Sequence, residues 1–150
     1  MNQNHLQIRA ATAEDREIAY KMICGLENMV LDRHNFNVVF DRNLKNNNIR
    51  YFLAFYENVA VGIVSCHIQS LLHHAALVSE IQEMYVEPEF RSQNIGSVLI
   101  ARAIDFATKA GAVQMEVTSR STREQAHRFY EQAGFEKSHV KLVRYFKNEE

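Results

Sequence analysis

The clearest fold signal in the chain is Glu80-Ile-Gln-Glu-Met-Tyr-Val-Glu-Pro-Glu-Phe-Arg-Ser-Gln-Asn-Ile-Gly-Ser97. Its first half is typical of a β-strand, and Pro88 ends that pattern because proline supplies no ladder donor. A polar turn follows, and then apolar residues recur at helical spacing: Ile95, Leu99, Ala103, Phe106 and Ala110. A strand–turn–helix unit aims backbone N–H groups and a helix dipole at one point, which favours a phosphate or pyrophosphate. On these residues alone, an ordinary strand-to-helix connection remains the alternative.

The bulk composition predicts one globular domain over residues 1–150. The chain has 150 residues, 47% of them hydrophobic and 23% charged, which is enough to bury a core. A net charge of −1 excludes a general attraction to nucleic acid or to an anionic membrane. No apolar run reaches transmembrane length, and the first residues lack the apolar core of a signal peptide. Cys24 and Cys66 show no metal-like spacing, so free thiols in a cytoplasmic protein are expected.

The remaining sequence predicts further strands and helices around the 80–97 unit. Apolar residues indicate strands over residues 6–10, 51–56, 59–70, 113–117 and 140–146. A capping box at Thr12 and Asp15 predicts a helix whose apolar face runs to Met29, and a second helix is expected over residues 36–44. Arg33 and His34 are then expected in the loop between these two helices. A short helix capped by Ser121 or Thr122 should end at Gly134.

Two motifs resemble those of the GNAT acetyltransferases. The acetyl-CoA motif of that family, Gln/Arg-x-x-Gly-x-Gly/Ala, is similar to Arg91-Ser-Gln-Asn-Ile-Gly96, with Asn94 in place of the first glycine. Asparagine tolerates the left-handed backbone better than most other residues. A helix ending in Phe-Tyr-x-x-x-Gly-Phe is matched by Phe129 to Phe135. The resemblance implies an α/β GNAT fold: a mixed, mostly antiparallel central sheet with a splay between its fourth and fifth strands, flanked by about four helices.

The resemblance also implies acetyl-CoA as the cosubstrate, bound along the 80–97 unit and by the Phe-Tyr helix. The residues implied are Met84, Tyr85, Val86, Arg91, Ser92, Gln93, Asn94, Ile95, Gly96, Ser97, Arg123 and Tyr130. Arg123 occupies a position that is asparagine in many family members, and its guanidinium could instead reach a phosphate. The oxyanion of the tetrahedral intermediate would be met by a backbone N–H between Met84 and Val86.

Acetyl transfer to an amine needs a base and an acid. An aliphatic amine with a pKa of about 10.4 is mostly protonated at neutral pH, and the leaving thiolate must gain a proton. Glu80 matches the offset of the glutamate that some family members use as base, and Glu83 is its competitor. Strict alternation places the two on opposite faces of a strand unless a β-bulge intervenes. Tyr130 is implied as the general acid, with a core aromatic residue as the alternative.

Within the superfamily, the resemblance is closest to the aminoalkylphosphonate N-acetyltransferases. It is carried by Asn48-Ile-Arg-Tyr51, Leu72-His-His74, Glu80-Ile-Gln-Glu83 and Ala126-His-Arg-Phe-Tyr130. It implies direct attack of a small primary amine on the thioester. A phosphonate needs cationic or multi-donor partners, for which the candidates are Arg50, His34, His73 and His74.

The same resemblance implies a divalent metal and, as is common in the family, a homodimer. Glu80, His73 and His74 could supply oxygen and imidazole ligands, although no spacing demands a metal. One alternative is an acetyltransferase for a polyamine, an aminoglycoside or a protein amine. An acidic pocket, to which Glu27, Asp32 and Asp41 could contribute, would favour a polyamine. The other alternative is a non-catalytic CoA-binding regulatory module, which would be expected to lack Glu80 or Tyr130; both are present.

Overall fold

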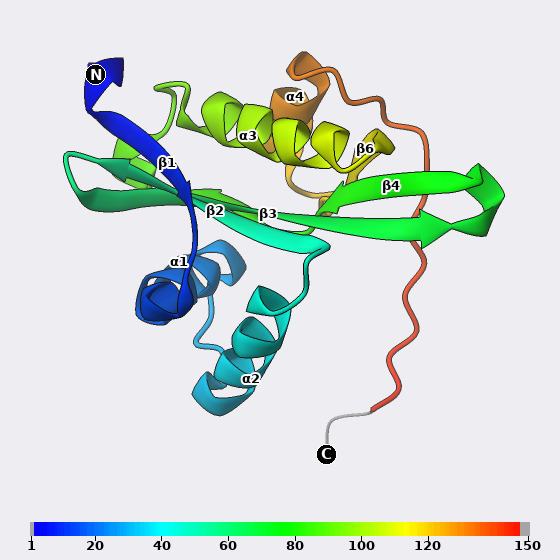
Figure 1. The fold of residues 1–150 in the computed structure, drawn as a ribbon, viewed down its shortest axis with the longest axis horizontal. Helices are drawn as coiled ribbons and strands as arrows, with labels where there is room; N and C mark the ends of the chain where they lie inside the picture. Colours follow the sequence, from blue (N-terminus) through cyan, green and yellow to red (C-terminus); the bar gives the residue numbers. More distant parts are fainter. Residues whose placement is uncertain (1, 148–150) are drawn as a thin grey trace. The chain divides into compact units, whose positions relative to one another are not determined.

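The structure is a computed structural model that describes residues 2–147. The chain forms two compact units, a first that extends to Glu116 and a second that begins at Val117. The first unit contains the sheet and the three helices that cover it (Figure 1). The second contains helix α4, Glu124–Gln132, and the chain that follows it. A single domain over residues 1–150 stays a prediction.

The sheet has the strand order β1-β2-β3-β4-β6, with β5 paired to β3 beyond the end of β4. The strands are β1 (Leu6–Ala10), β2 (Ile49–Tyr56), β3 (Val59–Leu71), β4 (Ala76–Ile81), β5 (Met84–Val86) and β6 (Ala112–Val117). The pairs β1–β2, β2–β3, β3–β4 and β3–β5 are antiparallel. Strand β6 joins β4 only after a helical crossover, the connection that parallel strands need, so the sheet is mixed as expected.

Helices α1 (Arg16–Glu27) and α2 (Arg33–Leu44) lie on one face of the sheet, and α3 (Ile95–Lys109) lies on the other (Figure 1). On the α1/α2 face the core is formed by Ala19, Met22, Phe40, Leu53 and Ile63. On the α3 face, a Cβ added to Gly62 would lie 3.0 Å from Leu99 Cδ1. From Gly62 to the end of β3, odd-numbered residues such as Ile63 therefore face α1 and α2, and even-numbered ones face α3.

Several predicted helix ends are wrong by a few residues. Helix α2 begins at Arg33, so Arg33 and His34 lie in its first turn and not in a loop. The cause is Asp32, whose carboxylate accepts a hydrogen bond from Asn35 N at 2.8 Å and so caps the helix early. Helix α1 ends at Glu27, before Met29, because Asn28 adopts a left-handed backbone. Helix α4 begins after Arg123, which replaces Ser121 and Thr122 as the N-cap.

The predicted last strand, residues 140–146, is also wrong. The described residues after Gln132 contain no strand, and Val140, Leu142 and Phe146 are 86%, 89% and 97% exposed. Alternating apolar residues form a strand only where another strand edge supplies hydrogen bonds. Within the second unit, the described chain beyond Val117 offers no such edge.

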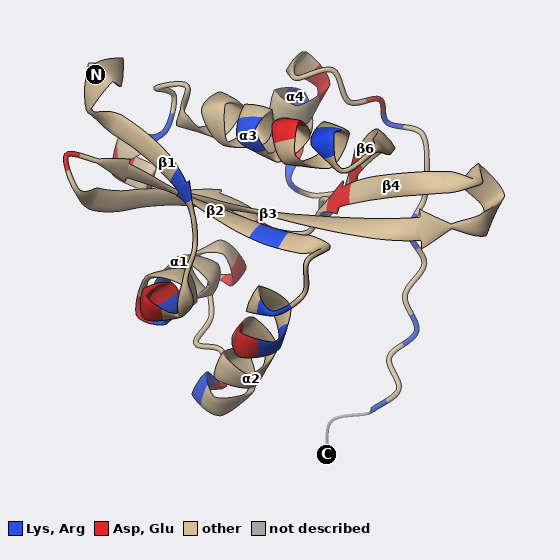
Figure 2. Cartoon of the chain, viewed as in Figure 1, with Lys and Arg blue, Asp and Glu red and all other residues tan. Residues whose placement is uncertain are grey.

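Acidic and basic residues alternate along the helices of the first unit (Figure 2). Helix α1 carries Glu17 and Lys21 one turn apart, and α3 carries Asp105 and Lys109 in the same arrangement. No helix among residues 2–147 is long and apolar enough to cross a membrane.

Candidate active site

The turn between β5 and α3 has the geometry expected of an anion-binding loop. Ser92 and Asn94 adopt left-handed backbone conformations, with φ of 63° and 69°. Asn94 is the N-cap of α3, which explains why asparagine can stand where the family motif has glycine. The first amides of the helix, from Ile95 to Ser97, have no acceptor within the helix and lie at its positive end. These amides could bind a pyrophosphate.

Arg91 holds the start of this loop against the end of β5. Its Nε donates a hydrogen bond to Val86 O at 2.8 Å, and its guanidinium lies 5.4 Å from the centre of the Tyr85 ring. Gln93 contributes within the loop, where its side chain donates to Glu89 O at 3.4 Å. Both side chains are therefore held by backbone acceptors at the start of the loop.

Strand β5 has one open edge in the described part of the chain. Strand β6 pairs with β4, whereas β5 pairs only with β3. On the paired edge, Glu83 O accepts from Ser65 N at 2.9 Å and Glu87 N donates to Val61 O at 2.8 Å. Alternation then turns the amides of Met84 and Val86 toward the open edge. This edge is the expected splay, and it offers backbone donors to a ligand.

A β-bulge separates β4 from β5. Glu80 lies opposite His67 and Met84 lies opposite Val64, so four steps on this side of the ladder match three steps on β3. The extra residue falls in the Gln82–Glu83 segment, between the end of β4 and the start of β5. Strict alternation from Glu80 to Glu83 is therefore wrong, because a bulge inserts one residue and changes which face the next side chains occupy.

The bulge brings both candidate carboxylates to the α1/α2 face. Glu80 shares that face with its partner His67, which lies on the odd-numbered side of β3. Tyr85 lies opposite Ile63 on the same face, and Glu83 stands two residues before Tyr85. Had the strand been regular, only one of the two glutamates could have pointed toward α1 and α2.

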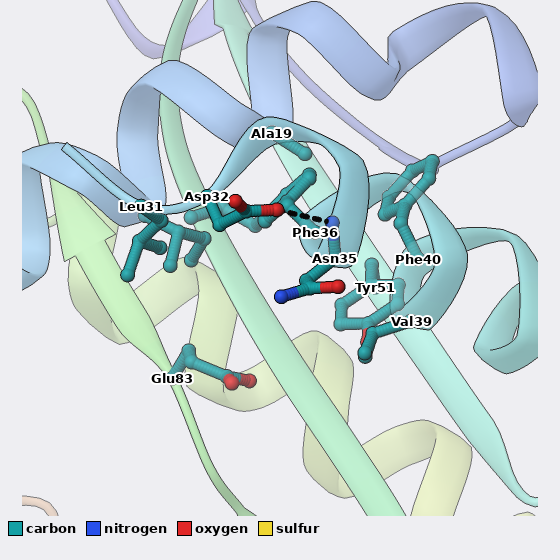
Figure 3. Close-up of a pocket in the computed structure, with 11 residues that line it drawn as sticks. Ala19, Leu31, Asp32, Asn35, Phe36, Val39, Phe40, Tyr51 and Glu83 are labelled. Carbon is teal, nitrogen blue, oxygen red and sulfur yellow. Dashed lines mark hydrogen bonds between the residues drawn. The ribbon is translucent and has the colours of Figure 1, made fainter.

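A cavity of about 380 Å³ lies between α1, α2 and the sheet, and Glu83 forms part of its wall (Figure 3). Its polar lining residues are Asp32, Asn35, Tyr51 and Glu83; the others are Ala19, Ile23, Leu31, Phe36, Val39, Phe40 and Ile63. Glu83 enters from the sheet, whereas Asp32 and Asn35 come from the start of α2 (Figure 3). The cavity is thus mostly apolar, with a few polar groups, as small-molecule sites usually are.

Glu83 has an unusual environment for a carboxylate. Its Oε1 is buried and has no hydrogen-bond partner, although such a group costs about 1–3 kcal/mol or more when left unpaired. Burial raises the pKa of the Tyr51 hydroxyl across the cavity, and the negative charge of Glu83 adds to that effect. Glu80 does not line the cavity. The geometry therefore favours Glu83 over Glu80 as the group that meets a ligand there.

His67 lies close to the two candidate carboxylates and was not predicted from the sequence. It lies opposite Glu80 on the cavity face, and burial lowers its pKa while the charges of Glu83 and Glu80 act in the opposite direction. The available signal was its position: a histidine in the otherwise apolar run of β3, in phase with Ile63 and Ser65. A single residue of that kind more often belongs to the core than to a site.

None of the predicted acceptor-binding residues lines the cavity. Arg50 points to the opposite face of the sheet, where its guanidinium lies 4.9 Å from the centre of the Phe106 ring of α3. His34 is exposed in the first turn of α2. His73 and His74 lie in the tight turn between β3 and β4, with their ring centres 4.4 Å apart. Side chains alternate along β2, so Arg50 and its neighbour Tyr51 lie on opposite faces of the sheet. Tyr51 lines the cavity, and Arg50 therefore does not.

The predicted metal ligands do not meet. Glu80 pairs with His67, whereas the turn with His73 and His74 begins beyond the Leu71–Ala76 pair, four residues further along. At about 3.3 Å per residue, the turn lies about 13 Å from Glu80. Nor does any group of three or more His, Cys, Asp or Glu residues among residues 2–147 form a metal site. The residues present thus do not fit the expected divalent metal.

Tyr130 and Arg123 belong to the second unit. The Tyr130 ring contacts those of Phe129 and Phe135, with ring centres 5.4 and 5.7 Å away. Burial raises the pKa of the Tyr130 phenol, and the positive charge of Arg123 opposes that shift. A phenol with a raised pKa keeps its proton at neutral pH, as a general acid must. The roles of both residues stay predictions.

Comparison with known proteins identifies the family. Residues 12–135 match the acetyltransferase (GNAT) family. The chain is 41% identical over 138 residues to an aminoalkylphosphonate N-acetyltransferase of Salmonella typhimurium, covering 92% of this chain and 90% of the relative. An uncharacterized N-acetyltransferase of Methanocaldococcus jannaschii is 33% identical over 60% of this chain and 40% of its own length.

Solved structures agree on the fold. A transcriptional regulator from Bacillus halodurans superposes with a TM-score of 0.85 at 27% identity, covering 95% of this chain and all of that one. An aminoglycoside N-acetyltransferase in complex with CoA gives the same TM-score at 19% identity, covering 95% of each chain. Because residues 12–135 of this chain match the family, the chain belongs to the GNAT acetyltransferases and is an N-acetyltransferase.

Proposed function

We propose that this enzyme transfers the acetyl group of acetyl-CoA to a small primary amine, with aminoalkylphosphonates as the preferred acceptors. The observation that carries the proposal is the place of Glu83: its unpaired Oε1 is buried beside the cavity, one residue before the open edge of β5. A carboxylate at the junction of an acceptor cavity and a thioester-binding edge can deprotonate an amine where it must attack.

In this mechanism the acceptor enters the cavity as an ammonium ion. Glu83 removes one proton, and the neutral amine attacks the thioester carbonyl. The amides of Met84 and Val86 stabilise the oxyanion, as preorganised backbone donors do. Collapse of the tetrahedral intermediate expels the CoA thiolate, which takes a proton from the acid that the family resemblance assigns to Tyr130. The amine nitrogen loses its second proton as the amide forms, and that proton restores the acid. Glu80 is the alternative base, acting through a water molecule.

Acetyl-CoA would bind with its pyrophosphate on the first amides of α3. The left-handed residues Ser92 and Asn94 shape the loop for that contact, and Arg91 fixes the loop to β5. Arg123 is proposed as a further contact to a phosphate. A homodimer, a cytoplasmic location and the absence of a nucleic-acid partner complete the proposal.

The preference for aminoalkylphosphonates is supported by the named activity of the Salmonella relative. The charges of the cavity limit how such an acceptor can bind. Its lining contains Asp32 and Glu83 but, among the described residues, no Lys, Arg or His. The amino end would therefore occupy the cavity, and the anionic phosphonate would stay at its mouth, away from the two carboxylates.

The same cavity favours a second candidate acceptor, a polycationic amine such as a polyamine or an aminoglycoside. Phe36, Phe40 and Tyr51 form a row of stacked rings, with centres 5.9 and 5.6 Å apart. Aromatic faces together with carboxylates attract ammonium groups. Of the acidic residues expected to favour a polyamine, only Asp32 lines the cavity, and Glu83 joins it there.

The deciding experiment measures CoA release from acetyl-CoA with aminomethylphosphonate, 2-aminoethylphosphonate, a polyamine and an aminoglycoside. Each amine is tested with an added divalent metal and with a chelator. Turnover confined to the aminophosphonates supports the proposed acceptor, and turnover that persists in chelator agrees with the finding that residues 2–147 hold no metal-binding cluster. Turnover only with the polyamine or aminoglycoside overturns the phosphonate assignment. Acetyl-CoA binding without any turnover would favour a protein amine or a regulatory role.

A further inference from the structure

The hydroxyl of Ser65 holds the bulge that carries Glu83, and we propose that Ser65 is a positioning residue for the acetyl-transfer reaction. Ser65 lies in β3 and is fully buried. It does not line the acceptor cavity, so it would act through Glu83 and not on the substrate. This inference rests on the proposed role of Glu83 as the base.

Three strong hydrogen bonds join Ser65 to the bulge. Its Oγ accepts from Glu83 N at 2.8 Å and from Gln82 N at 3.2 Å. Its own amide donates to Glu83 O at 2.9 Å. A longer contact of 3.4 Å runs from Ser65 Oγ to Glu83 O. The backbone of Glu83 is thus held at both its amide and its carbonyl by one residue of the neighbouring strand.

The Ser65 hydroxyl supplies the acceptor that a regular strand ladder would not offer to both amides of the bulge. Two successive amides point at the same place on β3, where a regular ladder would offer a carbonyl to only one of them. A serine oxygen has two lone pairs and accepts from both. Without it, these part-buried amides would lack a protein acceptor, which is costly enough to favour a different register.

A change of register here would move the base. Because side chains alternate along a strand, a slip of one residue turns Glu83 from the α1/α2 face to the α3 face. Glu83 would then leave the cavity that it now lines. The amides of Gln82 and Glu83 already donate to Ser65. The backbone donors left for the oxyanion are therefore the amides of Met84 and Val86.

The chain offers a matched control. Ser79 of β4 is also fully buried, and its Oγ donates to Gln114 O at 2.8 Å, joining β4 to β6 and not to the bulge. Ser65→Ala and Ser79→Ala each remove one buried hydroxyl from a central strand. Both should lower the thermal midpoint, Ser65→Ala by more, because it leaves two amides without an acceptor and Ser79→Ala leaves one carbonyl without a donor. Only Ser65→Ala should also move Glu83.

The test measures kcat and KM for both variants with whichever amine the wild type acetylates, together with amide hydrogen exchange at Gln82 and Glu83. We expect Ser65→Ala to lower kcat at least 10-fold, to leave the KM for acetyl-CoA within about 2-fold, and to speed exchange at both amides. We expect Ser79→Ala to keep kcat within about 2-fold. Ser65→Cys, whose thiol fills the same space but accepts weakly, should also lose activity. Ser65→Cys replaces Ser65→Ala as the test variant if Ser65→Ala does not fold.

Wild-type kcat in folded Ser65→Ala or Ser65→Cys would overturn the inference, as would an equal loss of kcat in Ser79→Ala. The exchange measurement needs no substrate. Fast exchange at the Glu83 amide in the wild type would therefore overturn the Ser65 clamp even if no amine is acetylated. Failure of the wild type on every amine, with slow exchange at that amide, would instead count against the proposed function.

Discussion

His67 of β3 lies directly opposite Glu80 of β4, on the face of the sheet that α1 and α2 cover. Directly opposed residues in an antiparallel pair have Cβ atoms about 4.5–5.5 Å apart, so the imidazole and the carboxylate are close neighbours. Glu83 acts on the same imidazole from the bulge. The α1/α2 face of the sheet therefore has two carboxylates and a histidine close together, an arrangement that regular alternation from Glu80 to Glu83 would not allow.

His67 should titrate below the ordinary histidine pKa of about 6.5, because burial is the largest influence on it. The negative charges of Glu83 and Glu80 favour the imidazolium, so Glu80→Gln and Glu83→Gln should each lower the pKa of His67 further. NMR titration of the His67 ring protons checks both statements. A short histidine-containing peptide, which titrates near the ordinary value, provides the reference. A rise of the His67 pKa in either variant would contradict the placement of the two carboxylates.

Glu83→Gln should reduce kcat by about 10²–10⁴-fold, the usual contribution of a general base. Glu80→Gln is the matched control, since it makes the same chemical change on the same face but outside the cavity lining. Glu80→Gln should lower kcat by a smaller factor than Glu83→Gln does. Steady-state kinetics over a range of pH measure both variants. If Glu80→Gln is the more damaging change, the base is Glu80, and the geometric preference for Glu83 is wrong.

Asn94→Ala should weaken acetyl-CoA binding, because alanine pays roughly 1–2 kcal/mol for the left-handed backbone that Asn94 adopts. Asn94→Gly, which restores the glycine of the family motif, should bind as well as the wild type or better. Isothermal titration with CoA compares the two. Equal affinity of both variants would mean that the loop tolerates another conformation and that its shape does not limit binding.

Asp15 should make stability sensitive to acid. Arg9 forms two hydrogen bonds to it, of 2.8 and 2.9 Å, and these lower the pKa of this buried carboxyl below its ordinary value of 3.8. The native state then binds fewer protons than the unfolded state, so the stabilisation is complete above the unfolded pKa and is lost as pH falls through the folded one. Urea unfolding between pH 7 and pH 2 measures it. Asp15→Asn should be less stable at pH 7 and should lose less stability on acidification.

The exposed Glu57 supplies the comparison for that experiment, since its contact with His5 lies at the surface, where ion pairs contribute little. Glu57→Gln should leave the acid dependence close to that of the wild type. An Asp15→Asn variant whose acid dependence equals that of Glu57→Gln would show that another carboxyl causes the acid sensitivity.

The amino-acid sequence by itself determined the features that depend on neighbouring residues. The 80–97 strand–turn–helix unit, the β2–β3 hairpin with its turn at Glu57 and Asn58, and the left-handed place of Asn94 all follow from local spacing and backbone preference. Such preferences act over a few residues, so they can be recognised without knowing what packs against them.

Only the tertiary structure decided where the site side chains point. The bulge at Gln82–Glu83 depends on Ser65, seventeen and eighteen positions away in sequence, because the acceptor that makes it stable belongs to another strand. Arg50 was predicted to bind the acceptor because its guanidinium suits a phosphonate, but the pairing of β2 places its side chain on the α3 face of the sheet. Register is set by partner strands and by the packing of whole faces, and a shift of one residue exchanges those faces. That is the reason why the spacing of glutamates alone could not choose between Glu80 and Glu83.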